Sequence, residues 1–192
     1  MRPLPSPQQI CSLIKEAAAE GPFPFLIAID GRCGSGKTTL GQRLADLLEA
    51  NLFHADDFYL RPCQRTPERY NEPGGNMDRE RLLREVLLPL RSGLAFAYRP
   101  YDCHAQALAA PITVQPKPFA VIEGSYSCHP ELFPLYNFRI FLSVDPQTQK
   151  ERIIKRGGPE CWPDFQSRWI PLEELYFSSL HPDRFCDLHL HT

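Results

Sequence analysis

Gly31-Arg32-Cys33-Gly34-Ser35-Gly36-Lys37-Thr38 sets the architecture expected of this chain. It matches the phosphate-loop pattern G-x-x-x-x-G-K-[ST] at every fixed position. The glycines let the backbone turn tightly, so that successive N–H groups point inward and form a cradle for phosphate oxygens. In such a loop the lysine reaches the β- and γ-phosphates and the threonine hydroxyl ligates magnesium. We therefore expect ATP and Mg²⁺ as cofactors, bound by residues 31–38 and by the neighbouring Thr39.

The residues on either side of this loop have the patterns of a strand and a helix. Residues 25–29 form a continuous apolar run, which is typical of a strand buried on both faces. From Lys37 onward, leucines recur at helical spacing. A strand, a glycine-rich loop and a helix in this order are the context that the phosphate-loop pattern requires.

Strands and helices continue to alternate along the chain. We expect further strands over 51–55, 119–122, 139–144 and 187–190, and helices over 8–20, 146–156 and 164–180 and after Asp78, which can cap the helix that follows it. This alternation predicts an α/β fold: a P-loop NTPase-type parallel sheet with helices on both faces and a small lid. We expect one domain over 1–192, with substrate-side insertions at 57–77 and 91–117 and a lid at 150–168.

Two acidic residues follow predicted strands, at the sheet edge where ligands bind in folds of this kind. Phosphoryl transfer needs a group that orients and deprotonates the attacking hydroxyl, and metal to neutralise charge. Asp56 is the candidate base, whereas Asp57 is expected to cap a turn or pair with an arginine. Glu123 ends an apolar strand as in a Walker B element, and we expect it to hold magnesium, directly or through water, or to contact substrate.

A basic helix precedes two glycines near the end of the chain. Arg152 and Arg156 are four residues apart and share a helix face. Gly157 and Gly158 would let the following segment move. We expect a lid that excludes water from the phosphates, with Arg152 in a catalytic role and Arg156 in nucleotide binding. The simpler interpretation is a solvated helix face.

Composition limits the partners and the compartment. The 192 residues carry a net charge of −2, which excludes a broad basic surface, so we expect no nucleic-acid partner. No apolar run is long enough to cross a membrane, and the stretch 1–9 lacks the apolar segment of a signal peptide. Seven dispersed cysteines without a Cys-x-x-Cys pair are typical of reduced thiols, which predicts a cytoplasmic protein.

Four features in order resemble the uridine kinase-like family, in the phosphoribulokinase and uridine kinase group of P-loop enzymes. The resemblance covers nearly the whole chain from about residue 25. The features are the phosphate loop, Asp56-x-Phe58-Tyr59, the Tyr101-Asp102 pair after Pro100, and Ile122-Glu123-Gly124 followed by the basic helix.

The resemblance implies roles for individual residues. The aspartate of Asp-x-Phe-Tyr is the base in that family, which supports Asp56. Asp78 looks like the family's contact to substrate hydroxyls, and Tyr59 and Tyr101 are expected beside the substrate, although Tyr101 could equally be a core aromatic. The family's base-reading histidine is replaced here by Gln106, and no Arg-Gly-Arg lid motif is present.

The expected activity is that of an ATP- and Mg²⁺-dependent small-molecule kinase, which moves the γ-phosphate to a hydroxyl of a nucleoside-like or other polyhydroxyl metabolite. Uridine, cytidine, nicotinamide riboside, pantothenate-like acids and sugars all remain open as acceptors. A nucleoside monophosphate would need additional arginines, which Arg61, Arg65 and Arg69 could supply. The alternatives are a nucleotide-binding regulatory ATPase and a nucleic-acid-dependent ATPase. Relatives often form homo-oligomers, which the residues here neither require nor exclude.

Overall fold

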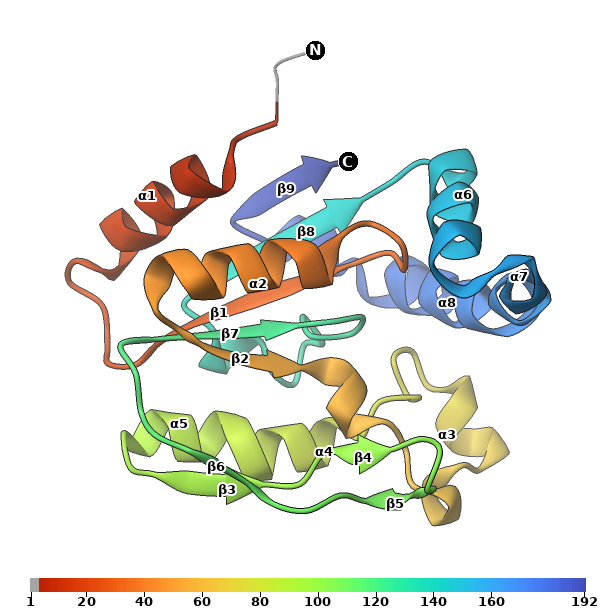
Figure 1. Ribbon diagram of the computed structural model, residues 1–192, viewed down its shortest axis with the longest axis horizontal. Helices are drawn as coiled ribbons and strands as arrows, with labels where there is room; N and C mark the ends of the chain where they lie inside the picture. Colours follow the sequence, from red (N-terminus) through yellow and green to blue (C-terminus); the bar gives the residue numbers. More distant parts are fainter. Residues whose placement is uncertain (1–3) are drawn as a thin grey trace.

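A parallel sheet of five strands forms the centre of the computed structural model, which describes residues 4–192 (Figure 1). The strand order is β2-β7-β1-β8-β9, and every neighbouring pair is parallel. The first three residues of the stretch 1–9, where no signal peptide is expected, lie outside the described residues. The predicted α/β sheet is therefore confirmed, with strands at β1 (Phe25–Gly31), β2 (Asn51–His54), β7 (Phe119–Glu123), β8 (Phe138–Ser143) and β9 (Leu188–His191).

One face of the sheet is covered by α1 (Pro7–Ala18) and α2 (Lys37–Leu48). Ser6 caps α1, because its hydroxyl accepts the Gln9 N–H and the Gln9 side chain accepts the Ser6 N–H. Apolar side chains from both helices pack with alternate residues of β1 in a single cluster that includes Ile14, Ile27, Ile29, Leu44 and Leu48.

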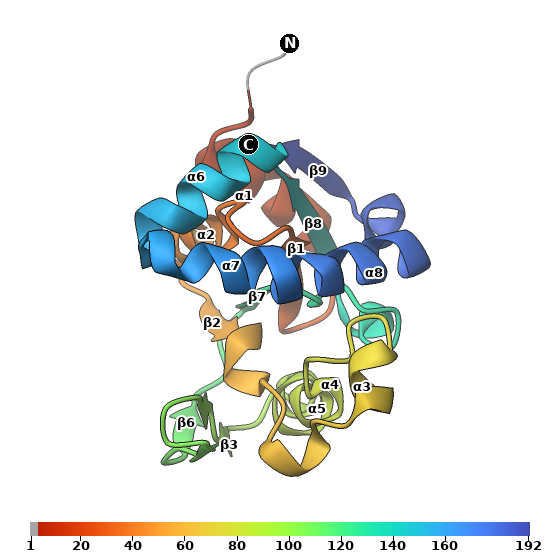
Figure 2. The same cartoon turned by 90° about the vertical axis from the view of Figure 1, so that its right-hand side faces the viewer.

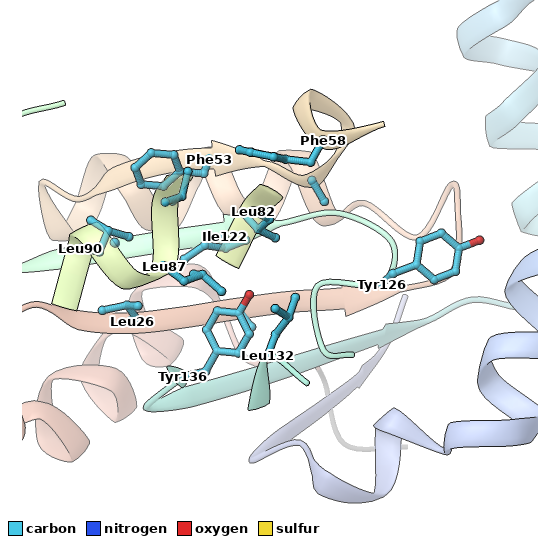
Figure 3. Packing of buried hydrophobic residues seen from close by; sticks show 14 of the residues in the cluster. Leu26, Phe53, Phe58, Leu82, Leu87, Leu90, Ile122, Tyr126, Leu132 and Tyr136 are labelled. Atoms are coloured by element: carbon cyan, nitrogen blue, oxygen red, sulfur yellow. The ribbon is translucent and has the colours of Figure 1, made fainter. Parts of the chain in front are cut away.

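The opposite face packs against a single helical run, α4 (Arg79–Leu82), a π-type turn (Leu83–Leu87) and α5 (Leu88–Ser92). Figure 3 shows the cluster that this run forms with the sheet. Leu26 and Ile122 point from β1 and β7 toward the helical leucines. Helices therefore cover both faces, as a mostly parallel sheet requires.

The two segments predicted as substrate-side insertions are more ordered than their composition indicates. The stretch 57–77 contains short helical turns rather than one open loop, and the stretch 91–117 forms two antiparallel ladders. The turns are Ala55–Phe58, Pro62–Gln64 and α3 (Pro67–Asn71). The ladders pair β3 (Phe96–Tyr98) with β6 (Ile112–Val114) and β4 (Tyr101–Asp102) with β5 (Ala107–Leu108).

The last helices cross the carboxyl ends of the strands. Figure 1 shows them at the end to which the strand arrows point, and Figure 2 shows α7 and α8 running across that end. They are α6 (Pro146–Gly157), α7 (Trp162–Asp164), a π-type turn (Phe165–Trp169) and α8 (Ile170–Leu180). Short 3-10 turns lie at Phe133–Leu135, Pro159–Cys161 and Pro182–Phe185. Of the helices in residues 4–192, none combines the length and apolar character needed to cross a membrane.

Candidate active site

The phosphate loop follows β1 and depends on glycine at two positions in particular. Gly31 has a φ of +136°, and a Cβ there would lie 2.0 Å from the carbonyl oxygen of Leu142 on β8. Gly36 has a φ of +94° and nothing within 4 Å of an added Cβ. Gly31 therefore permits close contact with the neighbouring strand. Gly36 is needed for its left-handed backbone conformation at the start of α2, since a side chain there would meet no other atom.

Lys37 is folded over the loop that precedes it. Its side chain is buried, and Nζ donates hydrogen bonds to the carbonyl oxygens of Gly31 (2.7 Å) and Arg32 (2.9 Å). These bonds hold the ammonium group at the mouth of the cradle. A cation in this place can balance the charge of a bound phosphate group.

Thr38 and Glu123 meet at the carboxyl ends of β1 and β7. The Thr38 hydroxyl donates to Glu123 Oε2 at 3.2 Å, and His54 Nδ1 lies 2.5 Å from Glu123 Oε1. The hydrogen bond to Glu123 raises the pKa of His54, and burial opposes the shift. A hydroxyl and a carboxylate are hard oxygen donors of the kind that Mg²⁺ prefers, so the pair fits the predicted metal site.

The raised pKa of His54 predicts a pH-dependent contribution to stability. A histidine whose pKa is raised in the folded state stabilises the protein fully below its unfolded pKa, about 6.5, and loses this effect as the pH rises through the folded value. Its side chain is 41% exposed, so solvent screening keeps the effect small. We expect the gap in unfolding free energy between the wild type and His54→Gln to shrink from about pH 6 to about pH 9. Urea unfolding at several pH values measures the gap, and a constant gap would contradict the pairing.

The side chains of Asp56 and Asp57 have different environments, although the two residues are adjacent in sequence. Asp56 is exposed and lines the cavity at this edge of the sheet, and its carboxylate forms no hydrogen bond within the described part of the chain. Asp57 Oδ2 accepts a hydrogen bond from the Tyr98 hydroxyl at 3.1 Å, and burial raises its pKa. Asp56 is therefore the carboxylate available to an acceptor, while Asp57 is tied to the core.

Two glutamates of α8 hold the phosphate loop, which the sequence analysis did not predict. The Cys33 N–H donates to both carboxylate oxygens of Glu173, at 2.9 and 3.0 Å, and the Ser125 hydroxyl donates to Glu173 Oε1 at 2.8 Å. Glu174 forms an ion pair with Arg32. Burial and then Glu173 raise the pKa of the Cys33 thiol to about 12. The Cys33 N–H thus donates to an anionic group, as the N–H groups of a phosphate cradle do.

Asp30 is a second residue that the sequence analysis missed. It is fully buried at the end of β1, and burial raises its pKa. Its carboxylate accepts hydrogen bonds from the N–H groups of Gly31 (2.6 Å), Tyr126 (3.0 Å) and Cys128 (2.9 Å), and from the Tyr176 hydroxyl (2.8 Å). One side chain therefore joins the phosphate loop, the segment after β7 and α8. Its position directly before Gly31 was the only local signal.

A cavity of about 900 Å³ lies where these elements meet. Six predicted loop residues line it: Cys33, Gly34, Gly36, Lys37, Thr38 and Thr39. Five further predicted residues line the same space: Asp56, Tyr59, Glu123, Arg152 and Arg156. Gly31, Arg32 and Ser35 belong to the loop but do not reach the cavity wall. The structure thus brings the predicted base, metal ligands and phosphate loop together, while their roles stay predictions.

Asp78 and Tyr101, which we expected beside the substrate, are not among the residues that line this cavity. Asp78 is buried, caps α4 by accepting the Arg81 N–H, and lies 3.6 Å from Arg81 Nε. Tyr101 is also buried, and its hydroxyl accepts a hydrogen bond from Arg65 at 2.8 Å. Asn76, two residues before Asp78, lines the cavity instead. Asp78 caps α4 through one carboxylate oxygen, whereas Asn76 faces the cavity.

The two predicted lid arginines lie along α6. Arg152 Nη1 lies 3.3 Å from the Gly34 carbonyl oxygen, to which it donates, and 2.9 Å from the Thr192 hydroxyl. The Arg156 guanidinium lies 5.9 Å from the centre of the Phe165 ring. Arg152 therefore contacts the phosphate loop directly, and Arg156 faces the cavity from the next helical turn.

Comparison with known proteins shows the fold. No family model matches the chain. It is similar over 96% of its length, and 96% of the other chain, to a structure described as a possible uridine kinase from Bacillus stearothermophilus, with a TM-score of 0.74 and 22% identity. A candidate fructose transport system kinase from Silicibacter sp. TM1040 is 20% identical with a TM-score of 0.65, over 97% of this chain and 99% of that one. A candidate P-loop kinase with a circular permutation from Saccharomyces cerevisiae is 12% identical with a TM-score of 0.60, over 98% and 99%. The chain therefore shares the α/β fold of these structures.

Proposed function

We propose that this chain is an ATP- and Mg²⁺-dependent kinase that transfers the γ-phosphate to a hydroxyl of a small polyhydroxyl metabolite. The observation that carries the proposal is the single cavity in which the phosphate loop, Glu123 and the unpartnered Asp56 carboxylate meet. A nucleotide-binding loop alone would fit many functions. A free carboxylate facing the same space is what transfer to a hydroxyl requires.

Each residue has a role in this reaction. Asp56 accepts the proton of the attacking hydroxyl, whose oxygen bonds to the γ-phosphorus as the bond from that phosphorus to the leaving oxygen of ADP breaks. Lys37 and Arg152 lie where they would contact phosphate oxygens and stabilise their charge. Thr38 and Glu123 would hold the magnesium ion, which supplies further charge neutralisation when bound.

The acceptor side of the cavity supports a polyhydroxyl molecule. Asn76, Gln106 and Tyr59 line it and carry groups that both donate and accept hydrogen bonds. Trp169 and Met77 add apolar surface beside them. Two similar structures are described as a possible uridine kinase and a candidate fructose transport system kinase. Uridine therefore stays among the acceptors to be tested, and fructose is the sugar to add.

The test is ADP release from purified protein with ATP and magnesium, in the presence of single acceptors. The panel holds uridine, cytidine, nicotinamide riboside, pantothenate, fructose, ribose and nucleoside monophosphates. We expect one class of acceptor to stimulate ADP release and to yield a phosphorylated product by mass spectrometry. Slow ADP release that no acceptor stimulates would contradict the kinase and favour a nucleotide-dependent regulator.

A further inference from the structure

Two arginines lie beside Tyr59 in the cavity, on the side where the acceptor would bind. The Arg65 guanidinium lies 5.1 Å from the centre of the Tyr59 ring, and Arg168 Nη2 lies 3.5 Å from the Tyr59 hydroxyl oxygen. Arg65 comes from the segment after β2 and Arg168 from the turn that leads into α8. Both side chains line the cavity. Residues 103 positions apart thus place two positive charges beside one tyrosine.

Arg65 and Arg168 are among the arginines of the described chain that are not paired with a carboxylate. Six arginines have a carboxylate within 4.0 Å: Arg32, Arg61, Arg69, Arg79, Arg81 and Arg139. Within residues 4–192, no carboxylate lies within that distance of Arg65 or Arg168. Arg65 donates only to neutral oxygens, those of Leu60, Gln106 and Tyr101, and Arg168 only to tyrosine hydroxyls. Two like charges that face one cavity, neither paired with a carboxylate, are stabilised when an anion binds between them.

Four arginines line the cavity, and we assign only Arg152 and Arg156 to the nucleotide. The cavity wall carries five cationic side chains against three carboxylates, although the whole chain has a net charge of −2. Lys37 and Arg152 contact the phosphate loop, and Arg156 lies one turn from Arg152. We assign these three to the phosphates of ATP. Arg65 and Arg168 remain as an additional positive pair beside the acceptor.

Asn76 indicates what else this part of the cavity binds. Its side chain lines the cavity at 7% exposure, and its Oδ1 has no hydrogen-bond partner in the described chain. The next residue, Met77, forms an antiparallel bridge with Tyr59, so Asn76 is one residue from the backbone partner of the tyrosine that both arginines contact. A buried carbonyl oxygen without a donor is costly, and a ligand hydroxyl would satisfy it.

We propose that the acceptor carries an anionic group, a carboxylate or a phosphate, which binds between Arg65 and Arg168 while one of its hydroxyls donates to Asn76. The acceptor is then a hydroxy acid or a sugar phosphate rather than a neutral sugar or nucleoside. This inference rests on the proposed kinase function, because only a kinase needs an acceptor in this position. Of the three arginines that the sequence offered as ligands of an acceptor phosphate, the proposal selects Arg65. Arg61 and Arg69 are paired with carboxylates, and Arg65 is not.

Binding tests the proposal without turnover. A non-hydrolysable ATP analogue with magnesium fills the phosphate loop, and matched neutral and anionic ligands are then titrated: ribose and ribose 5-phosphate, glycerol and glycerate, pantothenol and pantothenate. Trp169 lies 4.5 Å from the Arg168 guanidinium, so its fluorescence reports binding, with calorimetry as the second readout. We expect the anionic member of at least one pair to bind about 10- to 100-fold more tightly than its neutral partner.

Three variants make the result specific. Arg168→Ala should raise the Kd of the anionic ligand about 10- to 100-fold and leave that of the neutral partner unchanged. Arg168→Lys should recover part of the affinity, because it keeps the charge but not the planar fork. Arg43→Ala, an exposed arginine of α2 outside the cavity, removes the same charge and should change nothing.

Equal affinities within every pair, or an Arg168→Ala protein that binds the anionic ligand as well as the wild type does, would overturn the anionic acceptor. The kinase proposal would survive that result if a neutral acceptor still stimulated ADP release. Tight, Arg168-dependent anion binding without any stimulated ADP release would instead support the anion site and count against the kinase. The two failures are therefore distinguishable.

Discussion

Asp56→Asn should lower the kcat of acceptor phosphorylation about 10²- to 10⁴-fold, while the Kd for ATP stays nearly unchanged. Of the three carboxylates that line the cavity, Asp56 is the exposed one, and it accepts no hydrogen bond within the described chain. Asparagine has nearly the same shape but cannot accept a proton from a hydroxyl. Acceptor-stimulated ADP release measures kcat, and calorimetry with a non-hydrolysable ATP analogue measures nucleotide binding.

Asp57→Asn is the matched control for this prediction. Asp57 differs from Asp56 by one position and carries the same group, but it accepts a hydrogen bond from Tyr98 and does not line the cavity. Asparagine retains a carbonyl oxygen for that bond, so we expect kcat close to that of the wild type. If Asp56→Asn kept full acceptor-stimulated ADP release, or if Asp57→Asn showed the larger loss, the assignment of the base would be wrong.

Asp30→Ala should reduce the free energy of unfolding by about 3–5 kcal/mol. The substitution leaves the N–H groups of Tyr126 and Cys128 and the Tyr176 hydroxyl without their acceptor in a fully buried place. Each buried donor without a partner costs about 1–3 kcal/mol. Urea unfolding followed by circular dichroism measures the change as a lower midpoint at similar slope.

Two smaller substitutions show whether the hydrogen bonds of Asp30 cause this loss. Tyr176→Phe removes the hydroxyl that donates to Asp30 and should lower the free energy of unfolding by about 1 kcal/mol. Asp30→Asn keeps one acceptor oxygen and the volume, so its loss should fall between those of Tyr176→Phe and Asp30→Ala. An Asp30→Ala protein that unfolds at the same urea concentration as the wild type would show that other contacts hold α8 and the segment after β7.

Local sequence predicted most of the sheet, because its signals are short and strong. The run 25–29 is apolar at every position, and the loop after it matches the phosphate-loop pattern without deviation. Parallel strands end at a common edge, so strand ends at Asp56 and Glu123 could be placed near the loop before any tertiary contact was known. The segment 57–77 was harder, since its short turns are set by Pro62, Thr66 and Pro67 in a polar stretch without periodicity.

Within the candidate site, side-chain direction was the main property that the sequence analysis missed. Asp78 has the composition of a substrate ligand, but its carboxylate accepts the Arg81 N–H and lies against arginine, and Asn76 faces the cavity. A cap and a ligand use the same residue types, so composition does not separate them. Only the orientation of the turn before α4 distinguishes the two roles.

The sequence by itself determined that this protein is an α/β chain with a phosphate loop, and that acidic side chains follow its strands. Both depend on residues adjacent along the chain. The tertiary structure alone decided that Glu173 holds the Cys33 N–H from a position 140 residues away, and that Arg65 and Arg168 share Tyr59. Such contacts carry no local pattern, because they arise only when packing of the last helices across the strand ends brings distant segments together.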